Sequence, residues 1–195
     1  FSGAQSYDGD LTSWDVSQVT DLNYVFFRAF SFTDGGIGNW DVSSVTNMAG
    51  MFRDSSFSGD LSSWDTSSVW NLLECFRGAS VNPGNLSAWD VRSVSTTRLM
   101  FADSMYEGDL SSWKLTSLVD AFAMFQLATE FTGTGIATWE LPQLNNAAFM
   151  LDGASSFNED LCAWSLSSVN VTNMLVGTSC SSTADPTATA ACAVC

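Results

Sequence analysis

Residues 40–52 read WDVSSVTNMAGMF, and residues 14–26 read WDVSQVTDLNYVF, which is nearly the same string. Tryptophans that begin such strings recur every 24–26 residues, at Trp14, Trp40, Trp64, Trp89, Trp113, Trp139 and Trp164. A period of this length is typical of repeat proteins, in which one unit cannot bury its own apolar face and must stack on its neighbours. The 195-residue chain is therefore predicted to contain seven repeats.

Apolar side chains occupy the same offsets from tryptophan in every repeat. Leu or Ile stands three residues before it, and aliphatic residues stand two and five residues after it, with Thr66 as the polar exception. Twelve residues after tryptophan come Phe26, Phe52, Phe76, Phe101, Phe125, Leu151 and Val176. Columns that are apolar throughout predict a continuous stacked core, and they place the tryptophans inside it rather than on a sugar-binding surface.

The pattern LxxWxVxxV is similar to the leucine-rich-repeat pattern LxxLxLxxN, with Trp at the second leucine. Around WxV the apolar period is two, which predicts a short parallel strand of roughly three to five residues. Between VTNM and MF the apolar spacing is three and four, which favours a short helix or 3₁₀ turn. The sequence thus predicts an α/β repeat solenoid, leucine-rich-repeat-like and right-handed, with seven coils of about 25 residues and a parallel strand ladder.

The connections between repeats alternate in length. Repeats two, four and six carry GGIGNW, PGNLSAW and GTGIATW, whereas the other repeats carry GDL or EDL before tryptophan. In the even repeats, the segment between the preceding aromatic or aliphatic residue and tryptophan is one residue longer. This alternation predicts two kinds of turn along one edge. Phe1 and Tyr7 match Phe26 and Phe32 in spacing, so residues 1–179 are predicted to form a solenoid that starts within a partial repeat. Residues 180–195 are small and polar, and we expect them to form a C-terminal cap.

Four of the five cysteines lie in the last 34 residues: Cys162, Cys180, Cys192 and Cys195. This cluster predicts two disulfides and an oxidising compartment. Zinc is the alternative, because Cys192 and Cys195 form a CxxC, although a second CxxC is missing. Cys180 with Cys192 and Cys162 with Cys195 is one of three possible pairings. Cys75 stands at the same position in its repeat as Met51 and Met100 do in theirs. This predicts that Cys75 is a buried apolar residue.

The charge of the chain limits its partners. The net charge is −15 and the pI is about 4.1, so nucleic acid and anionic membrane are poor partners, whereas cations and basic proteins suit the surface. No apolar run approaches the ~18 residues of a membrane span, which argues against direct membrane insertion. The sequence has no His, which removes the commonest general base and a common metal ligand.

Carboxylates recur at two offsets. Asp15, Asp41, Asp65 and Asp90 directly follow tryptophan, and they are predicted to form an acidic strip that is either solvated or binds Ca²⁺ or a basic partner. A second series, Asp10, Asp60, Asp109 and Asp160, is interpreted as closing turns by accepting backbone N–H groups, with calcium as the alternative. Paired carboxylates can also cleave glycosides, but no repeat deviates to give an unequal acid and base, so we expect no enzyme.

Two N-x-S/T sequons begin at Asn85 and Asn170. Both asparagines lie outside the core columns, where a glycan could be attached. The sequons therefore predict two glycosylation sites and are consistent with secretion.

The string WDVSSVTNMAGMF followed by SSFSGDLSSWDTSSV closely resembles the BspA-like leucine-rich-repeat surface proteins of bacteria, mycoplasmas and protists, algae included. The resemblance covers nearly the whole chain. The cysteine-bearing end, from LCAW to CAVC, is similar to the terminal segment of algal members. The family implies a secreted or surface-anchored protein, often an adhesin or structural component, and it implies no catalytic residues.

Three functional hypotheses follow. The first is a non-enzymatic extracellular protein that serves adhesion, or forms a structural element or head-to-tail fibre, with a protein or glycan of a cell surface as partner. The second is a module whose acidic strip binds Ca²⁺ or a basic partner. The third is ice binding on a flat Ser-rich face, for which a regular Thr ladder is missing. None of the three requires a cofactor, with Ca²⁺ the one possible exception.

Overall fold

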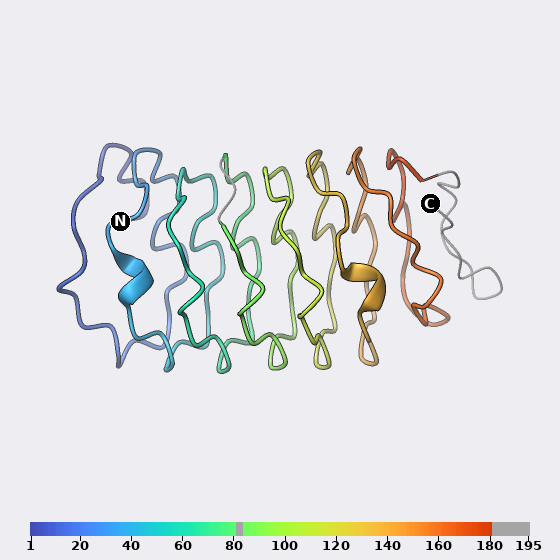
Figure 1. The fold of residues 1–195 in the computed structure, drawn as a ribbon, viewed down its shortest axis with the longest axis horizontal. Coiled ribbons are helices and arrows are strands. Elements are labelled where there is room, and N and C mark those ends of the chain that lie inside the picture. The colour runs from blue at the N-terminus through green and yellow to red at the C-terminus, as the bar shows by residue number, and fades with distance from the viewer. Residues whose placement is uncertain (81–83, 181–195) are drawn as a thin grey trace.

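The computed structural model describes residues 1–80 and 84–180. Successive repeats lie side by side along the long axis of the molecule (Figure 1). The fold of this part of the chain is compact but mostly irregular, and its only helices are two 3₁₀ turns, η1 (Ile37–Asn39) and η2 (Ile136–Thr138). Neither of these has the length and apolar character that a membrane crossing requires.

Single parallel bridges connect each repeat to the next. They join Asp21, Asn47, Asn71, Thr96, Asp120, Asn146 and Asn170 in that order. The bridging residue lies seven positions after tryptophan in the first six repeats and six positions after it in the last. The prediction of a strand of several residues around WxV is therefore wrong: within the described ranges, pairing occurs later in the repeat and is one residue long.

Local hydrogen bonds explain why the WxV segment does not pair. The Oδ1 atom of Asp41 accepts the N–H of Ser43 at 3.1 Å, and the N–H of Val45 donates to the carbonyl of Val42 at 2.8 Å. These N–H groups are used inside their own repeat, so they cannot reach the neighbouring one. A side chain that bonds its own backbone competes with a sheet ladder in this way.

Of the two alternatives predicted for the segment from VTNM to MF, a short helix or a 3₁₀ turn, the helix does not form and the segment consists of turns. Its alternate N–H groups donate to the next repeat at 2.8–2.9 Å, as from Leu22, Tyr24, Phe26 and Arg28 to the carbonyls of Asn47, Ala49, Met51 and Arg53. The intervening N–H groups close four-residue turns, as from Phe27 to the carbonyl of Tyr24 at 3.2 Å. An α-helix would need every N–H for its own segment. Tyr24 and Arg28 instead adopt left-handed φ values of 50° and 54°, which direct alternate N–H groups outward.

The two 3₁₀ turns occur in the longer connections. Both η1 and η2 follow a left-handed glycine, Gly36 with φ 71° and Gly135 with φ 88°, and both end one residue before the next tryptophan. The extra residue of repeats two and six is therefore taken up by a 3₁₀ turn, in agreement with the predicted alternation. The connection of repeat four includes residues 81–83, which lie outside the described part of the chain.

Stacked aromatic rings fill the core. Phe26, Phe52, Phe76, Phe101 and Phe125 follow one another with centroids 5.4–5.7 Å apart and planes within 9° of parallel. Phe1 extends this column, with its ring 5.7 Å from that of Phe26, as expected for a partial first repeat. The predicted burial of the tryptophans is confirmed for Trp40 and its five successors, which are 2–6% exposed, whereas Trp14 is 52% exposed.

Each of the six buried tryptophans also joins two repeats by a hydrogen bond. The indole Nε1–H donates at 2.9–3.1 Å to the carbonyl of the Leu or Ile that stands three residues before the preceding tryptophan. Trp40 thus bonds to Leu11, and Trp164 bonds to Ile136. The side chain of that Leu or Ile is itself fully buried, so one residue supplies both apolar contact and an acceptor.

One predicted core position is wrong in the last repeat. Val176 was expected in the phenylalanine column, but it is 44% exposed, and Leu175 is fully buried instead. The bridge at Asn170 shows the reason, because repeat seven has one residue fewer between tryptophan and the bridging position. The predicted cap at residues 180–195 lies outside the described residues except for Cys180.

We expect Trp89→Ala to lower the free energy of unfolding by about 3–5 kcal/mol, because it removes a buried indole and leaves the carbonyl of Leu61 without its donor. The matched control is Trp70→Ala, since Trp70 is 48% exposed, and we expect it to change stability by less than about 0.5 kcal/mol. Chemical denaturation followed by circular dichroism measures both. Equal losses from the two variants would contradict the role given to the buried tryptophans.

Candidate functional site

The predicted acidic strip lies on the surface, with Asp15, Asp41 and Asp65 exposed and Asp90 half-buried. The Oδ1 atom of each accepts the N–H of the residue two positions later, at 3.0–3.1 Å. Hydrogen bonds from the side chain and backbone of the following serine lower the pKa of Asp15 and of Asp41. Asp15 and Asp41 therefore stay ionised at neutral pH while they close turns.

The described residues contain no group of three or more Cys, Asp or Glu side chains placed to hold a metal ion. Asp90 is instead paired with Arg92, whose Nη2 atom lies 2.5 Å from the Oδ2 atom of the carboxylate. Calcium binding along the strip stays a prediction.

The second aspartate series has the predicted turn geometry. Asp10, Asp60, Asp109 and Asp160 each accept the N–H two residues later at 2.8–2.9 Å. Asn85 occupies the same place in the fourth repeat and accepts the N–H of Ser87 at 2.9 Å. Asn170 lies in the bridge column and accepts the N–H and the hydroxyl of Thr172. Both sequon asparagines are exposed, and their glycosylation stays a prediction.

The cysteines differ in state. Cys162 and Cys180 are disulfide-bonded, whereas Cys75 is a free and fully buried thiol. Burial raises the pKa of the Cys75 thiol, so it stays protonated and unreactive at neutral pH. Cys192 and Cys195 lie outside the described residues, and the predicted pairing stays a prediction.

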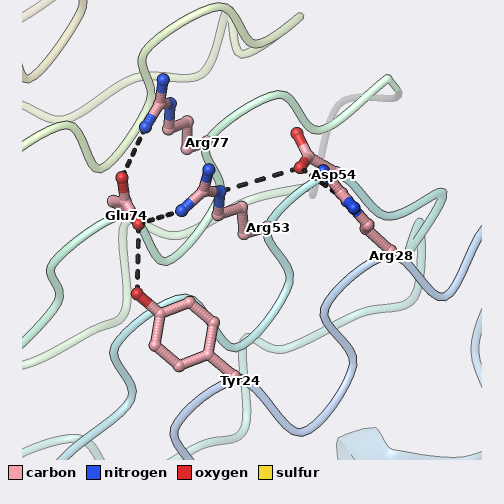
Figure 2. Close-up of polar contacts among 6 residues, drawn as sticks. All are labelled: Tyr24, Arg28, Arg53, Asp54, Glu74 and Arg77. Carbon is pink, nitrogen blue, oxygen red and sulfur yellow. Dashed lines mark hydrogen bonds and ion pairs between the residues drawn. The ribbon is translucent and has the colours of Figure 1, made fainter. Parts of the chain in front are cut away.

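A group of charged side chains that spans three consecutive repeats forms the candidate site, called here the arginine cluster (Figure 2). Its carboxylate centre is Glu74, which is only 8% exposed. Glu74 accepts hydrogen bonds from Arg53 and Arg77 at 2.5 Å each and from the hydroxyl of Tyr24 at 3.2 Å. The members of the cluster are Tyr24, Arg28, Arg53, Asp54, Glu74 and Arg77.

Asp54 is the second carboxylate of the cluster. Its Oδ2 atom lies 3.7 Å from the Nε atoms of Arg28 and of Arg53. Both guanidinium groups also lie over the ring of Phe27, at 4.9 Å and 5.3 Å from its centroid, within the range of a cation–π contact. Arg53 is thereby held by two carboxylates and an aromatic face.

The repeat geometry places these side chains together. Tyr24 and Glu74 stand ten residues after their tryptophans, and Arg28 and Asp54 stand fourteen after theirs, all with φ between 50° and 54°. Positions ten and fourteen lie on either side of position thirteen, where Arg53 and Arg77 stand in repeats two and three. Equivalent surface positions in adjacent repeats come side by side because the repeats stack in register.

Two effects oppose each other at Glu74. Burial raises the pKa of the carboxyl, but hydrogen bonds from Arg77 and the positive charges of Arg53 and Arg77 outweigh it, and the net result is a lowered pKa. Glu74 is therefore ionised at neutral pH. The cluster carries three positive and two negative charges, and the side chains of Arg28 and Arg77 are 56% and 37% exposed. Their remaining N–H donors can reach an oxygen-bearing partner in solvent.

Sequence reasoning missed this cluster because it followed columns that repeat, whereas the cluster lies where repetition fails. The offset of thirteen holds Ala102, Gln126 and Asp152 in repeats four to six. Three of the six Lys and Arg residues in the chain belong to the cluster. Sorting the few cations by their offset from tryptophan would have pointed to it.

Comparison with known proteins gives one family. The family described as "Mycoplasma protein of unknown function, DUF285" matches residues 1–105 and 72–187, which together span nearly the whole chain. No curated protein and no solved structure matches this chain.

We expect Glu74→Gln to destabilise the protein by about 1–3 kcal/mol at neutral pH, because Arg53 and Arg77 lose a charged acceptor. The pKa of Glu74 is lowered in the folded state, so its contribution is complete above the unfolded pKa and disappears as the pH falls through the folded pKa. The two proteins should therefore converge in stability under acidic conditions. Urea denaturation between neutral and acidic pH measures this.

The exposed Glu107 provides the control, and Glu107→Gln should leave the pH profile of wild-type stability unchanged. A constant difference between wild type and Glu74→Gln at every pH would contradict the ionised role of Glu74.

We expect thiol labelling of the oxidised protein to find one free thiol, at Cys75, and only after unfolding. Burial both shields this sulfur and suppresses its thiolate form. Intact mass before and after denaturation, with peptide mapping of the label, measures the outcome. A second labelled cysteine would contradict the assignment of the other four to disulfides.

Proposed function

We propose that this chain, which belongs to the DUF285 or BspA-like repeat family, is a non-enzymatic extracellular protein that serves adhesion or structural assembly at a cell surface. We further propose that its repeats form a leucine-rich-repeat-like solenoid with seven coils. The parallel bridges and the indole hydrogen bonds between repeats support that architecture.

The cysteines support an extracellular location. Cys162 and Cys180 are disulfide-bonded, and disulfides persist mainly in oxidising compartments. Cys75, which could act as a thiol nucleophile if exposed, is fully buried and protonated.

The use of the recurring carboxylates supports a role other than catalysis. Asp10, Asp15 and their counterparts in other repeats accept backbone N–H groups, and Glu74 is ionised between two arginines. A general acid needs a raised pKa, but the pKa of each of these three carboxyls is lowered.

The arginine cluster carries the adhesion proposal. A chain with a net charge of −15 gathers half of its cations in one group, over three repeats, and leaves Arg28 and Arg77 partly exposed. In a stack of similar repeats, a surface that departs from the pattern is the natural place for partner recognition. Arginine and aromatic residues also contribute much of the binding energy in protein interfaces.

Bead adhesion tests this function. Beads that carry the chain through a C-terminal tag are passed over a layer of cultured epithelial cells, and we expect far more of them to be retained than albumin-coated beads. Arg28→Ala combined with Arg77→Ala should reduce retention at least fivefold. Arg92→Ala should not reduce it, because Arg92 pairs with Asp90 outside the cluster.

Clumping of the beads with one another, scored in the same samples, detects assembly between copies. Retention equal to albumin beads together with an absence of clumping would contradict both forms of the proposal. Retention that requires millimolar Ca²⁺ and is lost in Asp41→Asn with Asp65→Asn would favour the acidic strip instead.

A further inference from the structure

A hollow of about 430 Å³ lies beside the arginine cluster and shares Arg28 and Asp54 with it. Figure 2 shows these two side chains together at one edge of the cluster. The volume falls within the range of small-molecule sites, roughly 300–1,000 Å³. The hollow is lined by Gln5, Arg28, Phe30, Asp54, Gly78 and Ser80.

The aromatic part of the lining is open to solvent. The side chain of Phe30 is 49% exposed, although phenylalanines in the core columns of the same repeats are fully buried. An exposed ring at the edge of a hollow offers a flat apolar face to a ligand. Aromatic faces of this kind contribute strongly to binding where they become covered.

The polar part of the lining is only partly satisfied within the protein. The Nε atom of Arg28 lies 3.7 Å from the Oδ2 atom of Asp54, which is longer than a hydrogen bond. The guanidinium and the carboxylate therefore keep donors and acceptors for a ligand, although the carboxylate is shared with Arg53, whose Nε atom lies at the same distance. Gln5 and Ser80 add an uncharged amide and a hydroxyl.

A glycine makes room for Asp54 in the wall of the hollow. Gly78 has φ 64°, and a Cβ atom at this position would collide with the Oδ1 atom of Asp54. The equivalent residue in the next repeat is Asp103, so the hollow depends on the glycine of repeat three. The absent side chain makes room for the carboxylate of Asp54, which packs over Gly78 in the lining of the hollow.

We propose that this hollow binds a neutral saccharide, with one pyranose ring against Phe30 and its hydroxyls bonded to Arg28 and Asp54. A pyranose has an apolar face that can pack on the ring of Phe30. Its adjacent hydroxyls can each donate to Asp54 and accept from Arg28. The lining has no net charge, and the field of a chain with a net charge of −15 disfavours an anion. The inference rests on the proposed adhesion function and gives it a ligand class.

The test titrates the full 195-residue chain with cellotriose, maltotriose, mannotriose and triacetylchitotriose, each at millimolar concentrations. We expect at least one to cause saturable shifts of the backbone amide signals of Phe30, Gly78 and Ser80 in ¹H–¹⁵N spectra. Phe30→Ala and Asp54→Asn should each weaken that binding at least tenfold. Asparagine tolerates the left-handed φ of 53° at position 54, so the substitution fits the backbone there.

The repeats supply matched controls. Met105→Ala changes an exposed apolar residue at the same offset from tryptophan as Phe30, and Asp103→Asn changes the counterpart of Asp54, with φ 56°. Neither should alter saccharide binding. Equal losses in these controls, or no saturable shift with any of the four trisaccharides, would overturn the proposal. Beads with Phe30→Ala that are retained as well as wild type would leave adhesion standing and remove the saccharide.

Discussion

The hydrogen bond from each buried indole to the carbonyl of the preceding repeat is the constraint on which the structure depends. A buried N–H that lacks a partner costs about 1–3 kcal/mol, so each tryptophan can be buried only where a carbonyl of the neighbouring repeat meets it. Six tryptophans satisfy this condition at 2.9–3.1 Å. The bond fixes one repeat against the next, and that register lets the phenylalanine rings stack and the alternate backbone N–H groups reach their acceptors.

The sequence predicted which side chains are buried but not how the backbone runs between them. Burial follows offset from tryptophan, so the columns that contain Trp89 and Phe101 could be identified directly. Backbone pairing depends on which N–H groups remain available, and Asp41 uses one that a strand around WxV would need. The missing residue of repeat seven, which exchanges Val176 for Leu175, becomes visible only through the bridge at Asn170. The arginine cluster was missed because surface offsets carry no apolar signal.

The proposed recognition site lies where the chain departs from its repeat. The core columns hold apolar residues in nearly every repeat, and this keeps the repeats in register. The surface positions can therefore differ from one repeat to the next. Arg53 and Arg77, at the same offset from tryptophan, make repeats two and three unlike those that follow. The left-handed residues that direct backbone bonds between repeats, such as Glu74, also position the side chains of the cluster. The same local geometry therefore makes the bonds between repeats and positions the side chains of the proposed recognition site.

Hydrogen exchange of the eight indole N–H groups tests the central claim most directly, because each gives its own signal in a ¹H–¹⁵N spectrum. The account predicts slow exchange for the six that bond to the preceding repeat, from Trp40 to Trp164, and fast exchange for Trp14 and Trp70, which are 52% and 48% exposed. If the six exchanged as fast as Trp70 under native conditions, the indole bonds would not hold the repeats together and the account would be contradicted.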